Sequence, residues 1–343
     1  MTPKDFNSSY PLSTFSPEEL QDFLINLFDL VFTCGLFHVL NVSGVVTNVM
    51  NILVLTKYGL HETTTLLLFS LSVSDLFCSI LLPFKRLHCF VSQFEPLLAI
   101  SIQSFTHVYL SSLPDFFICI SLLHTTIIAV ERLVAVWLPL KMSLIFTTSR
   151  VKWLLLFIYI YVVVLIAPTL FLLEISWIVD PSTNKTIATI VISKLYTSNL
   201  DIFNQYMYLG LPHVLSTSTF SISIGCSIVI GYKITVRRKT ILSQLSPCVS
   251  QKVKDVKVIK MLLTVCVVNS FVAFPTLAMD LYIYYSNTFI QSSGKLYLLI
   301  RGFFFILCQL KISVNFVIYI FMSSKFTATL NQIYHCRNNK NKK

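Results

Sequence analysis

Hydrophobic residues occur in seven long runs along this chain, separated by shorter polar segments. Each run is long enough for a helix of about 20 residues to cross the roughly 30 Å hydrocarbon layer of a bilayer. The pattern therefore predicts an all-α membrane protein, a single bundle of seven transmembrane helices. The expected spans are approximately 30–57, 64–86, 104–137, 152–174, 203–233, 256–285 and 296–322.

The composition agrees with this interpretation. Hydrophobic residues make up 55% of the chain and charged residues 12%, too few to give a mostly polar surface. Residues 1–21 are polar, acidic and rich in Pro and Ser, so we expect no cleavable signal peptide. The predicted organisation is an extracellular segment 1–29, a seven-helix domain 30–322, and a cytoplasmic tail 323–343 with a short amphipathic helix.

Basic residues indicate the orientation, because they concentrate on cytoplasmic segments. Residues 232–260 and the tail from Lys325 hold 13 of the 26 Lys and Arg residues, which places both segments inside and the N-terminus outside. The net charge of +11 is thus mainly a cytoplasmic basic surface that attracts anionic lipid headgroups. We expect no nucleic-acid partner.

Three asparagines stand in glycosylation triplets. Asn7 and Asn184 fall on the predicted outer side, whereas Asn41 lies inside the first helix and should be unused. Of the nine cysteines only Cys89 is clearly extracellular, so no disulfide framework can be read from the sequence.

A layer of polar residues is predicted near the bilayer centre, because helical rise converts sequence distance into depth. Its five members lie about 10 to 18 Å from the cytoplasmic ends of their helices. A single Asn or Ser there is explained by an interhelical hydrogen bond, but an Asp and a Lys at one depth favour a functional or structural pair. The five are Asn48, Asp75, Ser121, Lys311 and Asn315.

Two adjacent charges interrupt the third apolar run, in "TTIIAVERLVAVWLPL". Glu131 and Arg132 would cost several kcal/mol there unless paired, solvated or used. They are therefore candidates for function at the cytoplasmic end of this helix.

Five motifs resemble the helix signatures of rhodopsin-like G-protein-coupled receptors, in the right order and on the right helices. They are "GVVTNVMNILVL", "LSVSDLFCSILLPF", "AVERLVAVWLPLKM", "VAFP" and "SVNFVIY". "ERLVAVWLPLKM" and "KDVKVIKM" also resemble, more distantly, chemosensory-type receptors of molluscs.

The resemblance implies a mechanism. Arg132 would be restrained by Glu131 and by Asp255 at the foot of helix 6 until activation. Helix 6, kinked at Pro275, would then swing outward to admit a heterotrimeric G protein, with Tyr319 also part of the coupling machinery. Many relatives hold a sodium ion beside the helix 2 aspartate, and Lys311 is predicted to replace that ion.

Departures from the family pattern are expected to matter. His107 stands where helix 3 usually has a cysteine, and residues 174–201 contain none, so the usual extracellular disulfide cannot form. Ala273 and Phe316 replace the usual tryptophan of helix 6 and proline of helix 7.

Candidate ligand-binding residues in the outer half of the bundle are Asp115, Asp280 and Arg301. Cationic, zwitterionic and peptide ligands all stay open, including a chemosensory cue or a neuropeptide. An ion pair at the rim is the alternative role for Asp115. We expect a multi-pass plasma-membrane protein without a cofactor, and Cys336 is either palmitoylated or a free thiol.

Two other classes of membrane protein are alternatives to a receptor. A transporter or channel also uses intramembrane charges, but such proteins usually show repeated halves and Gly- or Pro-broken helices. A membrane enzyme would need a convergent cluster of ligands. The histidines are scattered without such spacing: His38, His88, His107, His124 and His213.

Overall fold

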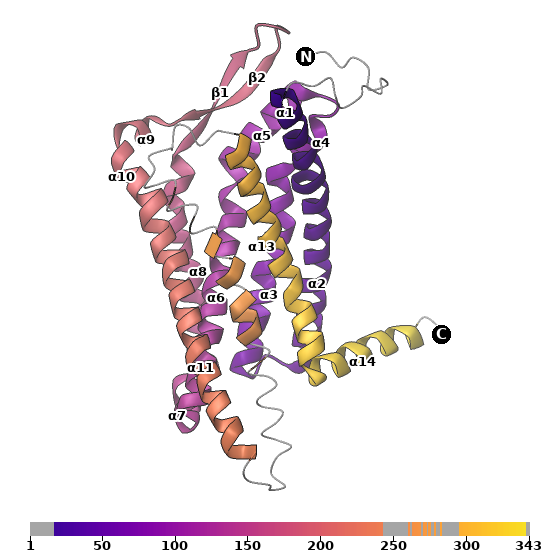
Figure 1. Ribbon diagram of the computed structural model, residues 1–343, viewed down its shortest axis with the longest axis vertical. Coiled ribbons are helices and arrows are strands. Elements are labelled where there is room, and N and C mark those ends of the chain that lie inside the picture. Colours follow the sequence, from indigo (N-terminus) through magenta and orange to yellow (C-terminus); the bar gives the residue numbers. More distant parts are fainter. Residues whose placement is uncertain are drawn as a thin grey trace.

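The computed structural model describes residues 17–242 and 295–340, together with parts of the stretch 260–282. Its long helices lie side by side, with a β-hairpin at one end and the turned-away helix α14 at the other (Figure 1). Among the described residues, five helices are long and apolar enough to cross a membrane, and a bent helix pair gives a sixth. These agree with six of the seven predicted runs.

The first span is longer than the predicted 30–57. It comprises α1 (Pro17–Phe28), a π-helical stretch (Asp29–Leu36) and α2 (Phe37–Tyr58), and it is apolar from Phe23 to Tyr58. It ends at Gly59, whose φ of 83° is readily adopted only by glycine.

Helices 2 and 3 are also extended at their outer ends. Helix 2 comprises α3 (Thr63–Leu81), a 3-10 turn (Leu82–Arg86) and α4 (His88–Val91). Helix 3 comprises α5 (Pro96–Phe105), a π-helical stretch (Thr106–Leu110) and α6 (Ser112–Trp137). The predicted start of helix 3 at residue 104 was therefore late, because "PLLAISIQS" continues the helix outward.

Helix 4 follows a short helix, α7 (Pro139–Ile145). It comprises α8 (Thr148–Ile166), capped by the Thr147 hydroxyl, and a 3-10 turn (Ala167–Phe171). The chain then forms an antiparallel hairpin of β1 (Leu173–Val179) and β2 (Thr186–Ile192), with Leu173 opposite Ile192 and Val179 opposite Thr186. The all-α expectation omitted this hairpin, whose β-branched strands are typical of sheets.

The remaining elements complete the bundle. Short helices α9 (Lys194–Ser198) and α10 (Leu200–Asn204) lead through π-helical stretches (Gln205–Gly210 and Pro212–Thr217) into α11 (Ser218–Leu242). A shorter apolar helix, Leu263–Val272, falls within the predicted sixth run. The last elements are α13 (Lys295–Met322) and α14 (Ser324–Lys340), which turn by 97° where the predicted tail helix begins.

The main core lies between helices 1, 2, 3, 4, 6 and 7, with α14 packed beneath it. Its members include Val54, Leu67, Ile128, Val162 and Tyr319. Helices 1 and 2 approach closely at Gly44, where a Cβ atom would collide with Ser79. This close packing brings the polar faces of the two helices together.

Candidate functional site

A compact charged cluster lies at the end of the bundle that the sequence predicts to be cytoplasmic, which we call the cytoplasmic mouth. Arg132 Nη2 donates to Glu131 Oε2 at 2.8 Å, and the Glu131 side chain is fully buried. Glu131 Oε1 accepts hydrogen bonds from the hydroxyls of Thr63 and Thr64, both at 2.9 Å, and Arg132 also donates to Thr64. Helix 3 is thus tied to the first turn of α3.

The two threonines had not been identified from the sequence, because threonine at a helix start is usually only a cap. Here their hydroxyls supply the donors that a buried carboxylate needs. Asp255, the second acid expected near Arg132, lies outside the described residues.

Next to this cluster, α7 carries exposed apolar side chains. Leu140 is 91% exposed and Leu144 is 67% exposed. Lys233 of α11 lies 4.1 Å from the ring centroid of Trp137, at the end of α6, and so joins helices 3 and 5 beside the same mouth.

The central polar residues form one connected network. Ser121 Oγ donates to Asp75 Oδ1 at 2.7 Å, and Asn315 Nδ2 donates to Asp75 Oδ2 at 3.1 Å. Lys311 Nζ donates to Ser121 Oγ at 2.8 Å, so the serine hydroxyl links the ammonium to the Asp75 carboxylate. All four residues are buried.

Asn48 belongs to the same layer but to a different set of bonds. Its amide donates to Gly44 O at 2.9 Å, and its oxygen accepts from Asn51 at 3.3 Å. Tyr319 is buried one turn beyond Asn315, and its hydroxyl has no hydrogen-bond partner among the described residues.

Asp115 is paired at the outer end of the bundle. Lys85 Nζ lies 2.8 and 2.9 Å from its two carboxylate oxygens, and 5.6 Å from the centroid of the Phe305 ring. The Asp115 side chain is 47% exposed and that of Lys85 is 12% exposed. The sequence did not single out Lys85 as a partner of Asp115, because Lys85 follows Pro83 at the end of an apolar run.

The other two outer candidates are not tested by this geometry. Asp280 lies outside the described residues, and Arg301 is placed on α13 without a described side chain.

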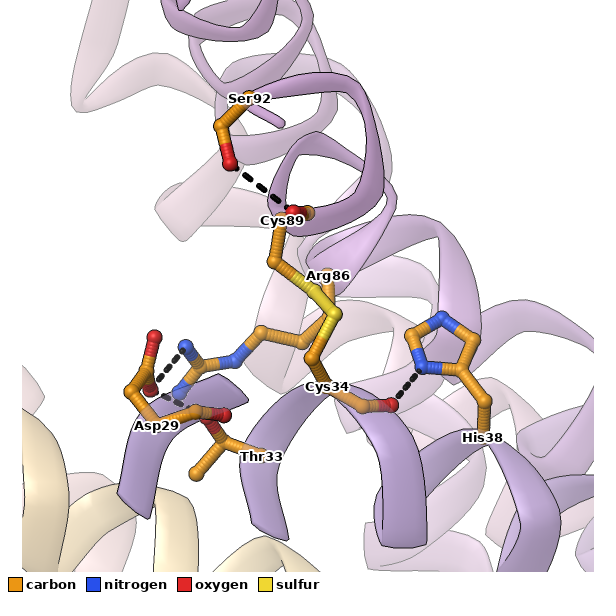
Figure 2. The surroundings of a disulfide bond; sticks show 7 residues. All are labelled: Asp29, Thr33, Cys34, His38, Arg86, Cys89 and Ser92. Carbon is orange, nitrogen blue, oxygen red and sulfur yellow. Dashed lines mark hydrogen bonds and ion pairs between the residues drawn. A yellow bond between two sulfur atoms is a disulfide. The ribbon is translucent and has the colours of Figure 1, made fainter. Parts of the chain in front are cut away.

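A disulfide joins Cys34 of helix 1 to Cys89 of α4, a pairing that could not be read from the sequence (Figure 2). Cys34 had been assigned to the membrane, but the longer first helix places it at the outer end of the bundle. Beside the disulfide, Arg86 extends toward Asp29, with 3.7 Å between Nη1 and Oδ1 (Figure 2).

This corner also contacts helix 7. A Cβ atom at Gly302 would collide with Thr33 and would lie 3.5 Å from Arg86 Nη2. The outer ends of helices 1, 2 and 7 therefore meet around the disulfide, a region we call the outer corner (Asp29, Cys34, Arg86, Cys89 and Gly302).

The hairpin is held to helix 3 by hydrogen bonds. Ser104 Oγ donates to Ala188 O at 2.9 Å, and Ala188 N donates to Ser101 Oγ at 3.1 Å. Trp177 of β1 packs edge-on against Phe105, with ring centroids 5.8 Å apart. These contacts lie near His107, the position where the family pattern would have the cysteine of its extracellular disulfide.

The hairpin turn carries the Asn184 triplet. Asn184 is exposed with a φ of 56°, whereas Asn41 is buried in helix 1. Hydroxyl hydrogen bonds from Ser182 and then Thr183 hold the pKa of the Asp180 carboxyl below its usual range. Asn7 lies outside the described residues.

Other predicted positions are only partly placed. Pro275 is helical and lies near α11, and Cys336 lies on α14 without a described side chain. His124 is buried with Nε2 3.0 Å from Ser70 Oγ. No group of three or more His, Cys, Asp or Glu in the described part of the chain could hold a metal ion.

The comparisons with known proteins agree with this arrangement. The family described as 7 transmembrane receptor (rhodopsin family) matches residues 47–337, from the Asn48 motif into α14. A search of curated proteins finds no match. The narrower resemblance to molluscan chemosensory receptors gains no support from the comparisons. Because the match covers most of the chain, the protein belongs to the rhodopsin family of seven-transmembrane receptors, which signal through G proteins and are not enzymes.

Proposed function

We propose that this receptor binds an extracellular small molecule or peptide at the plasma membrane, as a chemosensory cue or a neuropeptide. Binding would release the cytoplasmic cluster, and helix 6 would move outward to admit a heterotrimeric G protein. The pair of Arg132 with the buried Glu131, which is tied to Thr63 and Thr64, is the observation that carries this proposal.

Its chemistry is that of a reversible restraint. The Arg132 guanidinium cannot donate to a partner while it is hydrogen-bonded within the cluster of Glu131 and the two threonine hydroxyls. Once that cluster separates, the guanidinium becomes a free donor. Asp255, at the foot of helix 6, would be a second restraint on the same guanidinium. In that arrangement release of Arg132 and movement of helix 6 are one event.

The surface around the mouth supports a protein partner. Leu140 and Leu144 form an exposed apolar patch on α7, and such patches on cytoplasmic surfaces are typical of protein contacts. The basic residues of 232–260 would add attraction to an acidic partner and to anionic lipid. Palmitoylation of Cys336 would anchor α14 to the inner leaflet.

On the outer side the ligand would contact Asp115, Asp280 and Arg301. The ion pair with Lys85 reduces the preference of Asp115 for a cationic ligand, because the carboxylate is already neutralised. Asp115 therefore suits a zwitterionic ligand or a neutral hydrogen-bond donor better than a simple amine.

The test is nucleotide exchange on purified heterotrimeric G proteins by the receptor in nanodiscs, during a screen of amines, amino acids and peptides. An agonist should accelerate exchange in the native receptor and much less in the Leu140→Asp variant, with ligand binding unchanged. Ligand-dependent ion flux in the same cells without nucleotide exchange would instead favour the transporter or channel alternative.

A further inference from the structure

A groove lies between α11 and the helical segment Leu263–Val272. Its volume is about 470 Å³, within the range of small-molecule pockets. Its walls are almost entirely apolar, with Phe220 and Ile228 on α11 facing Phe271 and Phe274. Ile228 is 66% exposed and Phe271 is 73% exposed, so the groove is open on the side that faces away from the bundle.

The position of the groove identifies the medium outside it. Its α11 wall belongs to the membrane span His213–Val236. Ser227 lies nine residues before Val236, which is about 14 Å of helical rise in a hydrocarbon layer of about 30 Å. The groove therefore opens to the middle of the bilayer.

Two serines provide the polar groups of this groove. Ser227 is 9% exposed and Ser270 is 5% exposed, and they come from opposite walls. A serine in a helix often donates to the backbone carbonyl one turn earlier, as Ser74 and Ser79 do. Neither Ser227 nor Ser270 makes a hydrogen bond within the described part of the chain. A hydroxyl that faces hydrocarbon without a hydrogen-bond partner is costly.

Ser270 also reaches a small polar void at the junction of helices 3, 5 and 6. The void has a volume of about 10 Å³ and is lined in addition by Thr125, Thr126 and Ser223. Thr126 and Ser223 hydroxyls lie 3.1 Å apart. The polar end of the groove is thus continuous with hydroxyls of the bundle interior.

We propose that this groove binds an uncharged lipophilic molecule with one hydrogen-bonding group, of the long-chain alcohol type, which enters from the bilayer. The hydroxyl of the ligand would bond to Ser227 and Ser270, and its chain would lie against the phenylalanines. A charged headgroup is disfavoured because a charge at the bilayer centre costs several kcal/mol.

The occupant would also affect signalling, a consequence that rests on the proposed function. One wall belongs to helix 6, so a ligand that prefers one spacing of the two helices shifts the equilibrium between signalling states. Binding itself does not depend on that movement and can be measured alone.

The experiment uses purified full-length receptor in nanodiscs and two photoreactive probes. One is a long-chain alkanol with a diazirine near its hydroxyl and a terminal alkyne, and the other is the matching alkane without the hydroxyl. Labelled peptides are located by mass spectrometry, and unlabelled alkanol serves as competitor. One variant combines Ser227→Ala with Ser270→Ala, and a second, Ile228→Trp, fills the groove. The control is Ile160→Trp on α8, because Ile160 is 54% exposed and lies away from the groove.

The alkanol should label α11 and Leu263–Val272 above the other spans. The paired serine change should weaken alkanol competition by about 2- to 10-fold per lost hydrogen bond and leave the alkane unaffected. Ile228→Trp should abolish the selective labelling, and Ile160→Trp should preserve it. Equal labelling of α8 and the groove, insensitivity to Ile228→Trp, or equal effects on both probes would overturn the proposal. Nucleotide exchange measured in parallel distinguishes a failure of binding from a failure of signalling.

Discussion

Lys311 Nζ lies 2.8 Å from Ser121 Oγ, and the same hydroxyl donates to Asp75 at 2.7 Å. The Lys311 ammonium is thus linked through a single hydroxyl group to Asp75, the one acidic residue that we assigned to the central layer. A mobile cation would compete with Lys311 for one negative charge in a medium of low dielectric constant. We therefore propose that Lys311 takes the place of a bound sodium ion.

This proposal predicts a sodium effect in the variant and none in the native receptor. Lys311→Ala leaves Asp75 buried without its cation, which for buried pairs costs roughly 3 to 5 kcal/mol. Thermal unfolding of the variant in nanodiscs should shift upward in sodium chloride relative to potassium chloride. Native receptor that responds equally to sodium would contradict the idea, and Asp75→Asn combined with Lys311→Ala should cost less than the single changes sum to.

Thr64→Val should raise ligand-independent nucleotide exchange several-fold. The change removes hydroxyl contacts with Glu131 and Arg132 while preserving side-chain shape, and hydrogen bonds to charged groups contribute roughly 1.5 to 3 kcal/mol. Thr65→Val is the matched control at the next position. Equal basal activity in both variants, at equal surface expression, would argue against a restraint through Thr64.

Asp255→Ala should also raise basal exchange if this acid restrains Arg132 from helix 6. Opposite charges in a partly desolvated mouth attract more strongly than at an open surface. Combining Asp255→Ala with Thr64→Val would show whether both act on one guanidinium, because effects through a shared partner are not additive. Unchanged or lower basal activity would remove Asp255 from the mechanism.

Asp115→Asn should weaken agonist potency at least tenfold if this carboxylate contacts the ligand. It also leaves Lys85 without its partner, so a loss of stability is expected as well. Asp115→Asn with Lys85→Met removes both charges and should restore surface expression. Restored potency in that double variant would show that the pair is structural, whereas potency that stays low supports ligand contact.

Cys34→Ser or Cys89→Ser should lower the stability of the purified receptor by roughly 2 to 4 kcal/mol, because the bond closes a loop between residues 55 positions apart. Thermal unfolding followed with a thiol-reactive dye measures the loss. Cys119→Ser, a change at a free cysteine, is the control and should unfold near the native temperature.

The central network could be predicted because helical rise is nearly constant. Asp75, Ser121, Lys311 and Asn315 fall at matching depths whatever the details of packing, and helix 7 was expected at 296–322 and found at Lys295–Met322. The order of the helices followed from hydrophobic runs that only a membrane explains.

Pairs that depend on the paths of extramembrane segments could not be predicted. Cys34 meets Cys89 only because helices 1 and 2 continue beyond the expected ends of their apolar runs. Lys85 and Asp115 both lie within predicted runs, and their contact depends on how helix 2 is rotated against helix 3. The roles of Thr63 and Thr64 depend on the rotation of helix 2 against helix 3, which apolar periodicity does not determine. The hairpin was missed for a related reason, since a search for long apolar runs does not detect two short strands.

The hydrogen bonds between Ala188 and the serines at 101 and 104 have a consequence for handling the protein. A thiol reductant added during purification would cut the Cys34–Cys89 link and loosen the first helix, yet the hairpin would stay seated on helix 3. Loss of ligand binding in a reduced sample would therefore point to damage at the outer corner. Urea, which competes for hydrogen bonds, would affect the hairpin while the disulfide survives.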